Sequence, residues 1–207
     1  MTRIQIITRL IKPAMFIALL VPLVLLVLRG ITDDLGANPV ETITHETGLW
    51  ALRLLLLTLA ITPLCKITGI SEFVHFLRMT GLYSFFYALL HFTTYIWLDQ
   101  SFDLGSIIAD VIKRPYITVG FTTFLLLIPL AATSHNRIIR LLGGQHWKHL
   151  HRLVYFCGLG AVLHYLWLVK ADTFSPMIYL SIFLILMLFR LHGDEKLPPM
   201  EEQGGQS

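Results

Sequence analysis

Long stretches with almost no charged residues constrain the fold of this chain more than any other feature of its sequence. Of its 207 residues, 55% are hydrophobic and only 14% are charged. A soluble domain of this composition would expose large apolar patches to water. Several uncharged stretches approach the roughly 20 residues that a helix needs to cross about 30 Å of hydrocarbon. The composition therefore predicts an all-α integral membrane protein surrounded by membrane lipid.

Hydrophobic periodicity predicts a bundle of six transmembrane helices. The predicted spans are Ile11–Leu28, Gly48–Leu64, Thr80–Leu98, Pro115–Ala132, Leu150–Val169 and Phe174–Arg190. We expect residues 1–10 to form a cytoplasmic N-terminus, residues 11–190 the transmembrane domain, and residues 191–207 a disordered cytoplasmic tail. The first span follows basic residues, as a signal peptide would. Because no small-residue cleavage site follows it, we interpret it as a membrane anchor.

The distribution of basic residues orients the predicted bundle. With both termini in the cytoplasm, the basic residues on that side are Arg3, Arg9, Lys12, Lys66, Arg78, Arg137, Arg140, Lys148, Arg152, Arg190 and Lys196. Those on the opposite side are only Arg29, Lys113, Arg114 and Lys170. Positive charge gathers on the cytoplasmic side of membrane proteins, so the topology is predicted to be N-in, C-in. Topology thus explains the net charge of +3 without nucleic-acid binding.

Two of the nine histidines lie deep inside uncharged spans. His91 and His164 occur about eleven and fourteen residues into the third and fifth spans, which both start on the cytoplasmic side. At 1.5 Å per residue, their depths differ by roughly 5 Å. Because buried polar side chains are costly in a membrane, we expect the two imidazoles to bind one heme b iron from opposite faces. The aromatic residues expected around this heme are Phe85, Phe86, Phe92, Tyr165 and Trp167.

The residues nearer the cytoplasm leave the number of hemes open at one or two. His151 precedes His164 by thirteen residues, which is about 20 Å along an ideal helix. The accompanying rotation of about 220° places the two on different faces of that helix. Arg78 precedes His91 by the same thirteen residues, and an arginine side chain is a better partner for a heme propionate than a ligand for iron. For a second heme beside His151, His75 would have to supply the second axial bond to the iron, although its rotation around the helix is unfavourable for this.

Arg53, in the second predicted span, has two interpretations of equal weight. Its guanidinium could extend to the membrane interface along its own helix. It could equally neutralise a propionate of the outer heme or contact a quinone headgroup. The buried histidines also have a rival interpretation, in which the chain is a transporter that relays protons rather than electrons.

Five blocks of sequence resemble the MsrQ family, also called YedZ, of bacterial membrane proteins. The blocks are residues 38–64 in three parts (38–41, 48–53 and 61–64), 81–91, 113–120, 147–155 and 164–170. They cover helices and loops along nearly the whole chain. The resemblance implies a ferric-reductase-like transmembrane domain in the bacterial inner membrane. His91, His151 and His164 fall on positions that match the family's histidines.

The resemblance also implies a path for electrons. They would come from the quinol or menaquinol pool, pass through heme b and FMN, and leave to MsrP, a periplasmic molybdenum enzyme that reduces oxidised methionine. FMN is implied by the family alone. The chain has no glycine-rich phosphate loop, so a soluble donor such as a cytoplasmic flavin reductase would be another molecule. We therefore expect an electron-transfer subunit rather than an enzyme; a ferric or quinone reductase with another acceptor is the alternative.

Overall fold

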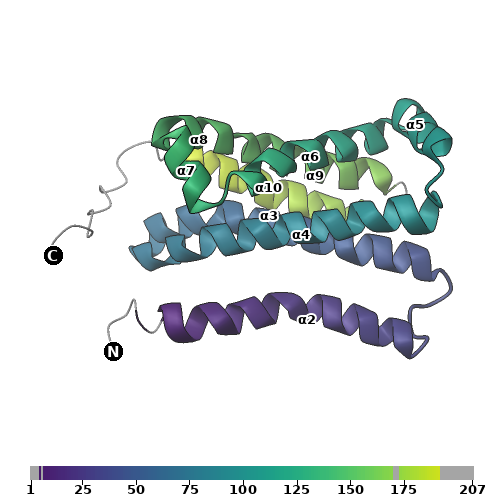
Figure 1. Ribbon diagram of the computed structural model, residues 1–207, viewed down its shortest axis with the longest axis horizontal. Helices are drawn as coiled ribbons and strands as arrows, with labels where there is room; N and C mark the ends of the chain where they lie inside the picture. The colour runs from purple at the N-terminus through teal and green to yellow at the C-terminus, as the bar shows by residue number, and fades with distance from the viewer. Residues whose placement is uncertain (1–4, 6, 170–172, 192–207) are drawn as a thin grey trace.

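The computed structural model describes residues 5, 7–169 and 173–191, and no strand occurs among them (Figure 1). Its long helices are α2 (Lys12–Ile31), α3 (Pro39–Thr68), α4 (Leu77–Thr94), α6 (Pro115–Ala132), α9 (Leu153–Leu168) and α10 (Phe174–Leu191). Its shorter helices are η1 (Ile7–Ile11), η2 (Ser71–Phe76), η3 (Tyr95–Asp99), α5 (Leu104–Lys113), α7 (Asn136–Leu142) and α8 (Gly144–His151). The prediction of an all-α fold is confirmed for the described residues.

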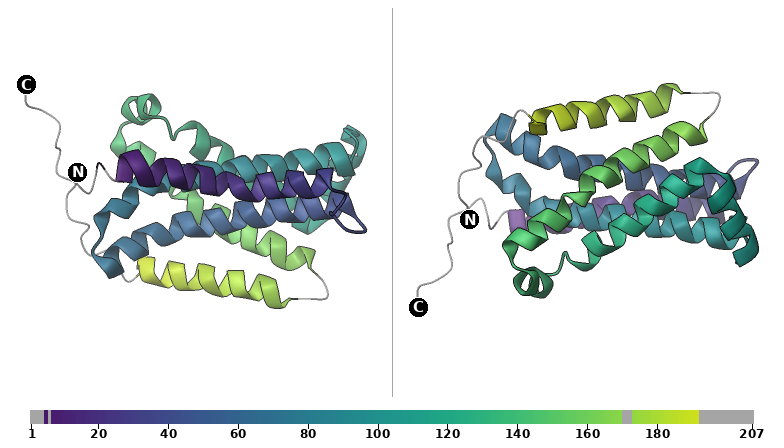
Figure 2. Two further views of the ribbon diagram at one scale, coloured as in Figure 1. Left: turned by 90° about the horizontal axis from the view of Figure 1, so that it is seen from below. Right: turned by 90° about the horizontal axis from the view of Figure 1, so that it is seen from above.

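Four helical stretches are long and apolar enough to cross a membrane. They are Arg9–Ile31, Pro39–Thr68, Ser71–Asp99 and Pro115–Ala132. The helix over Phe174–Arg190 is apolar but shorter, and α9 has 16 residues. Each long helix overlaps one of the predicted spans, and successive long helices run in alternating directions (Figure 2). The chain is therefore a multi-pass membrane protein.

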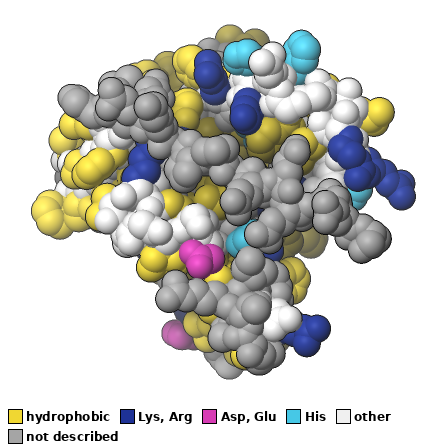
Figure 3. All heavy atoms as spheres, turned by 90° about the vertical axis from the view of Figure 1, so that its left-hand side faces the viewer, with side chains coloured by type: hydrophobic (Ala, Val, Ile, Leu, Met, Phe, Trp, Pro, Cys, Tyr) yellow, Lys and Arg dark blue, Asp and Glu magenta, His cyan; other side chains and the backbone are white. Residues whose placement is uncertain are grey.

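The bundle has two ends that differ in charge. One end, which carries α7 and α8, is here called the α7–α8 end; the other, which carries α5, is called the α5 end (Figure 1). The described basic residues at the α7–α8 end include Lys12, Lys66, Arg78, Arg137, Arg140, Lys148, Arg152 and Arg190. Figure 3 looks onto this end and shows Lys and Arg side chains beside several histidines. The expectations for Arg3, Lys170, Lys196 and the tail beyond Leu191 lie outside the described residues.

Helix α3 lies at the centre of the bundle. It contributes to each of four clusters of buried side chains, which join it to α9 and α10, to α2 and α4, to α6 and α9, and to η2. Between helices in lipid, such close packing replaces the hydrophobic effect as the source of stability. The α3 residues in these clusters are Leu52, Leu54, Leu55, Leu56, Leu59, Ile61 and Cys65.

Helix α3 begins nine residues before the predicted start at Gly48, which corrects the position of Arg53. Asn38 caps the helix by accepting a hydrogen bond from the backbone N–H of Glu41, and Pro39 suits its first turn. The threonine hydroxyls of the early turns donate to backbone carbonyls, as Thr47 does to Ile43. This polar first part hid the helix from the hydropathy pattern. Arg53 therefore lies about four turns into α3 instead of one and a half.

The predicted fifth span, Leu150–Val169, is two helices rather than one. Helix α8 ends at His151, and α9 begins at Leu153. The Trp147 indole N–H donates to the Thr133 carbonyl over 3.0 Å, which holds α8 against the end of α6. The break is the single residue Arg152, whose backbone keeps right-handed helical angles, so His151 ends α8 and His164 lies within α9.

Candidate functional site

A largely apolar cavity of about 610 Å³ lies inside the bundle and extends to the α5 end. Helices α3, α4, α6 and α9 form its walls, and residues of η3 and α5 stand at its mouth. Its volume falls within the range of about 300–1,000 Å³ that is typical of ligand and cofactor sites. The cavity is therefore large enough for an organic cofactor.

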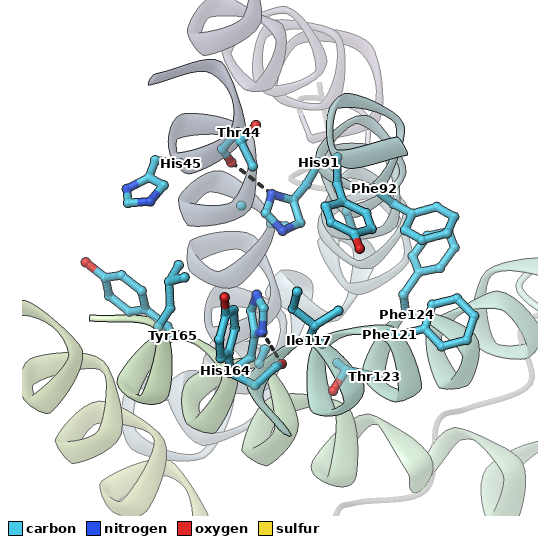
Figure 4. Close-up of a pocket in the computed structure, with 18 of the residues that line it drawn as sticks. Thr44, His45, His91, Phe92, Ile117, Phe121, Thr123, Phe124, His164 and Tyr165 are labelled. Atoms are coloured by element: carbon cyan, nitrogen blue, oxygen red, sulfur yellow. Dashed lines mark hydrogen bonds between the residues drawn. The ribbon is translucent and has the colours of Figure 1, made fainter. Parts of the chain in front are cut away.

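His91 of α4 and His164 of α9 both project into this cavity (Figure 4). Their ring centroids are 6.1 Å apart, and their ring planes make an angle of 74°. The two rings thus lie on facing walls of the same space, although 73 positions separate them in the sequence. The expected proximity of these two imidazoles is confirmed.

Hydrogen bonds fix which nitrogen of each ring carries the proton. His91 Nδ1 is 2.8 Å from the Thr44 carbonyl oxygen, and His164 Nδ1 is 2.7 Å from the Tyr116 carbonyl oxygen. Because a carbonyl can only accept, each Nδ1 must donate its hydrogen. The lone pair of the neutral ring is then on Nε2, which is the arrangement typical of metal-bound histidines.

Two glycines allow the rings to reach those carbonyls. A Cβ atom on Gly48 would lie 2.9 Å from His91 Nδ1, and one on Gly120 would lie 2.6 Å from His164 Nδ1. Both distances are shorter than real Cβ contacts, so a side chain at either position would displace the ring. Each glycine is four residues after the carbonyl that its histidine binds, so each ring lies across one turn of the facing helix.

The spacing of the rings fits two axial ligands of one porphyrin iron. Two metal–imidazole bonds of about 2 Å, together with the ring halves behind them, span roughly 6 Å. Among the described residues, no group of three or more His, Cys, Asp or Glu could hold a bare metal ion. A heme needs only two protein ligands, because the macrocycle supplies the other four. The residues present therefore fit a heme better than an isolated ion.

Aromatic side chains line the cavity, but they are only partly the predicted ones. Phe92 and Tyr165 line it, as expected, together with Phe121 and Phe124 of α6 (Figure 4). The rings of Phe92 and Phe124 stack with their centroids 4.5 Å apart.

The other three aromatic predictions are wrong. Phe85 stacks on Phe124 without lining the cavity. Phe86 packs in the cluster that joins α4 to α2, and the Trp167 side chain is 51% exposed. Their periodicity placed them near the histidines, but the rotation of each helix turns them to other faces.

His151 and Arg78 lie at the α7–α8 end and do not line the cavity. His151 Nε2 is 3.1 Å from the Thr133 hydroxyl, and its ring lies against Trp147 with centroids 4.0 Å apart and planes tilted by 31°. Arg78 donates to the side-chain oxygen of Asn136. Thr133 directly follows α6 and Asn136 begins α7, so His151 and Arg78 do lie at the same end of the bundle. His75 is an exposed residue of η2.

Arg53 lies on the outside of the bundle rather than in the cavity. Its Nε donates to the Tyr179 hydroxyl over 2.9 Å, and its guanidinium carbon is 5.0 Å from the centre of the Trp50 ring. The contact with Tyr179 joins α3 to α10, whereas Trp50 lies on α3 itself. The structure therefore does not bring Arg53 to the space that the two histidines share.

Sequence reasoning gave no role to several residues that build this site. Gly120 lies inside a predicted span between two large apolar residues, where a glycine indicates close helix approach, and Gly48 is the first residue of its predicted span. Arg114 was counted only as a topological charge, yet its side chain lines the cavity mouth. The carbonyls of Thr44 and Tyr116 carry no sequence signal, because every residue has one.

Comparison with known proteins places the chain in a family. It matches the family described as "Ferric reductase like transmembrane component" over residues 47–162. Three relatives bear the name "Protein-methionine-sulfoxide reductase heme-binding subunit MsrQ". The one from Herminiimonas arsenicoxydans is 50% identical over 184 residues, which cover 88% of this chain and 84% of the relative.

The other two relatives are equally similar. The protein from Xanthomonas campestris pv. campestris (strain B100) is 53% identical over 160 residues, which cover 77% of this chain and 73% of the relative. The one from Rhodospirillum rubrum is 48% identical over 183 residues, 88% of each chain. No solved structure matches the chain. By this identity and coverage, the chain belongs to the MsrQ family and carries its ferric-reductase-like transmembrane domain.

Proposed function

We propose that this protein is the membrane electron-transfer subunit of a methionine-sulfoxide reductase system, and that His91 and His164 are the axial ligands of one heme b. One observation carries the proposal: two imidazoles, each held through Nδ1 by a backbone carbonyl, face each other at 6.1 Å inside an apolar cavity. The relatives' names, which call them heme-binding subunits, support it.

The protein's part is to present two ligands in one fixed geometry. The Nδ1–H bonds to the Thr44 and Tyr116 carbonyls orient the rings and make Nε2 more basic. The apolar walls limit water around the site, which affects the reduction potential of an iron held there. When bound, a heme held by His91 and His164 would supply one-electron transfer.

The proposal includes six membrane crossings with both termini in the cytoplasm of a cell with an inner membrane. The alternating directions of the six long helices support an even number of crossings. The accumulation of basic residues at the α7–α8 end supports a cytoplasmic location of that end. The cavity would then open toward the periplasm.

The electron path is proposed from the family resemblance. Electrons would enter from the quinol or menaquinol pool, with a cytoplasmic flavin reductase as a further donor, and leave to periplasmic MsrP, where methionine sulfoxide is reduced. FMN has no assigned residues here. A second heme near His151 and Arg78 stays a proposal; to bind iron, His151 would have to give up the contact of its Nε2 with Thr133.

The heme content of purified variants tests the ligand assignment. We expect the wild-type protein to show a reducible b-type spectrum and His91→Ala and His164→Ala each to lose the heme of this cavity. His149→Ala, which removes an exposed histidine at the α7–α8 end, is the matched control and should retain it. A colourless wild-type protein, or histidine variants with full heme, would exclude the proposed function.

A further inference from the structure

The mouth of the cavity has an uneven charge distribution. Among the described residues that line the cavity, Arg114 is the one lysine or arginine. Two carboxylates, Glu41 and Asp99, line the same end. Among the described lining residues, Arg114 is therefore the one lysine or arginine beside two carboxylates at the point where the cavity reaches the surface.

The contacts of Arg114 leave part of its guanidinium available. Its Nε is 3.3 Å from Asp110 Oδ1, and its Nη1 donates to the Tyr116 hydroxyl over 3.4 Å. A guanidinium has five N–H donors in a planar fork, so the Nη2 group is not used by these contacts. The Arg114 side chain is 53% exposed, whereas that of Asp110 is 16% exposed.

Asp110 holds this arginine in place. Besides Arg114, Asp110 accepts a hydrogen bond from the Gln100 side-chain amide over 3.2 Å and faces the Tyr95 hydroxyl at 3.5 Å. These contacts join α5 to η3 and to the start of α6. The partly buried Asp110 thus positions the Arg114 guanidinium at the mouth of the cavity.

The far end of the cavity offers nothing to a carboxylate. Leu55, Ala88 and Leu127 line that part, and the two hydroxyls there are already engaged. Ser84 donates to the Ala51 carbonyl over 2.9 Å, and Thr123 donates to the Val119 carbonyl over 2.8 Å. An ionised carboxylate placed among these groups would be desolvated without a partner, at a large cost in free energy.

We propose that Arg114 binds a carboxylate of the heme at the cavity mouth. The inference rests on the proposed function, in which the heme occupies the cavity. A heme is an apolar macrocycle with two carboxylates on one edge, and the apolar far end directs that edge toward the mouth. At the mouth, the carboxylates of Glu41 and Asp99 would repel the heme carboxylates, and the unused N–H groups of the Arg114 guanidinium would attract one of them. From the sequence, a propionate contact was one of two equally weighted interpretations of Arg53, which does not line the cavity.

The test compares heme with its dimethyl ester, which has no ionisable carboxylate. Protein produced without heme is loaded with either compound, and release to excess apomyoglobin is followed by absorbance. In the wild-type protein we expect the ester to leave about tenfold faster than heme, which corresponds to one lost charge-assisted hydrogen bond. In Arg114→Gln, the two compounds should leave at nearly the same rate.

Lys113→Gln is the matched control, because it removes the same charge one position away, from an exposed side chain that does not line the cavity. It should keep the wild-type ratio, and Arg114→Lys should give an intermediate one. Equal release of heme and ester from the wild-type protein would overturn the inference even if Arg114→Gln failed to fold. That result would not affect the assignment of His91 and His164 as heme ligands. A wild-type protein that binds neither compound would instead refute the proposed function itself.

Discussion

His164 and His151 are both partly buried histidines near α9, but they are held in opposite ways. His164 uses Nδ1 to reach a backbone carbonyl and leaves Nε2 to the cavity. His151 uses Nε2 to contact the Thr133 hydroxyl, and its ring lies against Trp147. The comparison teaches that two partly buried histidines can engage the protein through different nitrogens: Nε2 of His164 is left to the cavity, whereas Nε2 of His151 joins α8 to the end of α6.

The largest effect is expected from filling the space beside His164. Gly120→Ala would place a Cβ 2.6 Å from His164 Nδ1 and 2.7 Å from its Cε1, so the ring must move and lose its bond to the Tyr116 carbonyl. Loss of such an orienting bond typically lowers metal affinity by about 10- to 100-fold. Heme titration of the purified variant measures the loss. Unchanged affinity would show that the carbonyl bond does not orient the ligand.

A smaller effect of the same kind is expected at His91. Gly48→Ala would place a Cβ 2.9 Å from His91 Nδ1 and 3.0 Å from its Cε1, a milder conflict that a slight ring movement can relieve. We expect a loss of heme affinity of up to about tenfold. Gly81→Ala is the control on α4, because its Cβ would meet only Thr58 Cγ2 at an ordinary 3.7 Å. A reversed order, with Gly81→Ala the most damaging, would contradict the proposed geometry.

A moderate effect on stability, and none on the heme of the cavity, is expected at the α7–α8 end. Thr133→Val removes the hydroxyl that His151 Nε2 contacts and should lower the free energy of unfolding by about 1 kcal/mol. Thermal unfolding in detergent measures this change, and the absorbance spectrum reports the heme. If Thr133→Val or His151→Ala abolished the heme signal that His164→Ala also abolishes, the distinction between the two histidines would fail.

The smallest effect is expected at Asp103, which caps α5 at the cavity mouth. Hydrogen bonds from the Ser106 hydroxyl and the Gly105 backbone N–H lower the pKa of Asp103 below its usual 3.8. A lowered folded-state pKa means that the carboxylate stabilises this turn above the unfolded-state pKa, and that this stabilisation is lost as the pH falls through the folded-state value. Asp103→Ala should therefore speed amide exchange in the first turn of α5 at pH 7.

Hydrogen–deuterium exchange checks this prediction, with the amides of α10 as an internal reference. The wild-type protein and Asp103→Ala should differ at neutral pH and converge below the pKa of the carboxyl. Equal exchange at neutral pH would mean that the cap contributes nothing to the order of the first turn of α5.

The hydropathy pattern predicted where the helices lie. The similar depths of His91 and His164 in their spans predicted that the two side chains meet. Both predictions depend only on positions counted along individual helices. The structure differs where side chains override those patterns. The polar turns after the Asn38 cap extend α3 by nine residues, and the contacts of Trp147 and His151 with Thr133 hold α8 against the end of α6.

The wall of the site was less predictable than its ligands. Which aromatic residues line the cavity depends on the rotation of α4 and α9, and this rotation turned Phe86 and Trp167 away while α6 supplied Phe121 and Phe124. The carbonyls that orient the histidines lie 47 and 48 positions away from them. A contact of a backbone group over such a separation depends on tertiary packing and leaves no mark on the local sequence.

Electron paramagnetic resonance of the oxidised protein at low temperature tests the central claim most directly, because the spin state of ferric heme reports its axial ligands. We predict a low-spin signal of a heme with two imidazole ligands in the wild-type protein. His91→Ala and His164→Ala should each replace it with a high-spin signal or remove the heme, while His151→Ala leaves it in place. A wild-type signal that survives the loss of either His91 or His164 would contradict the account.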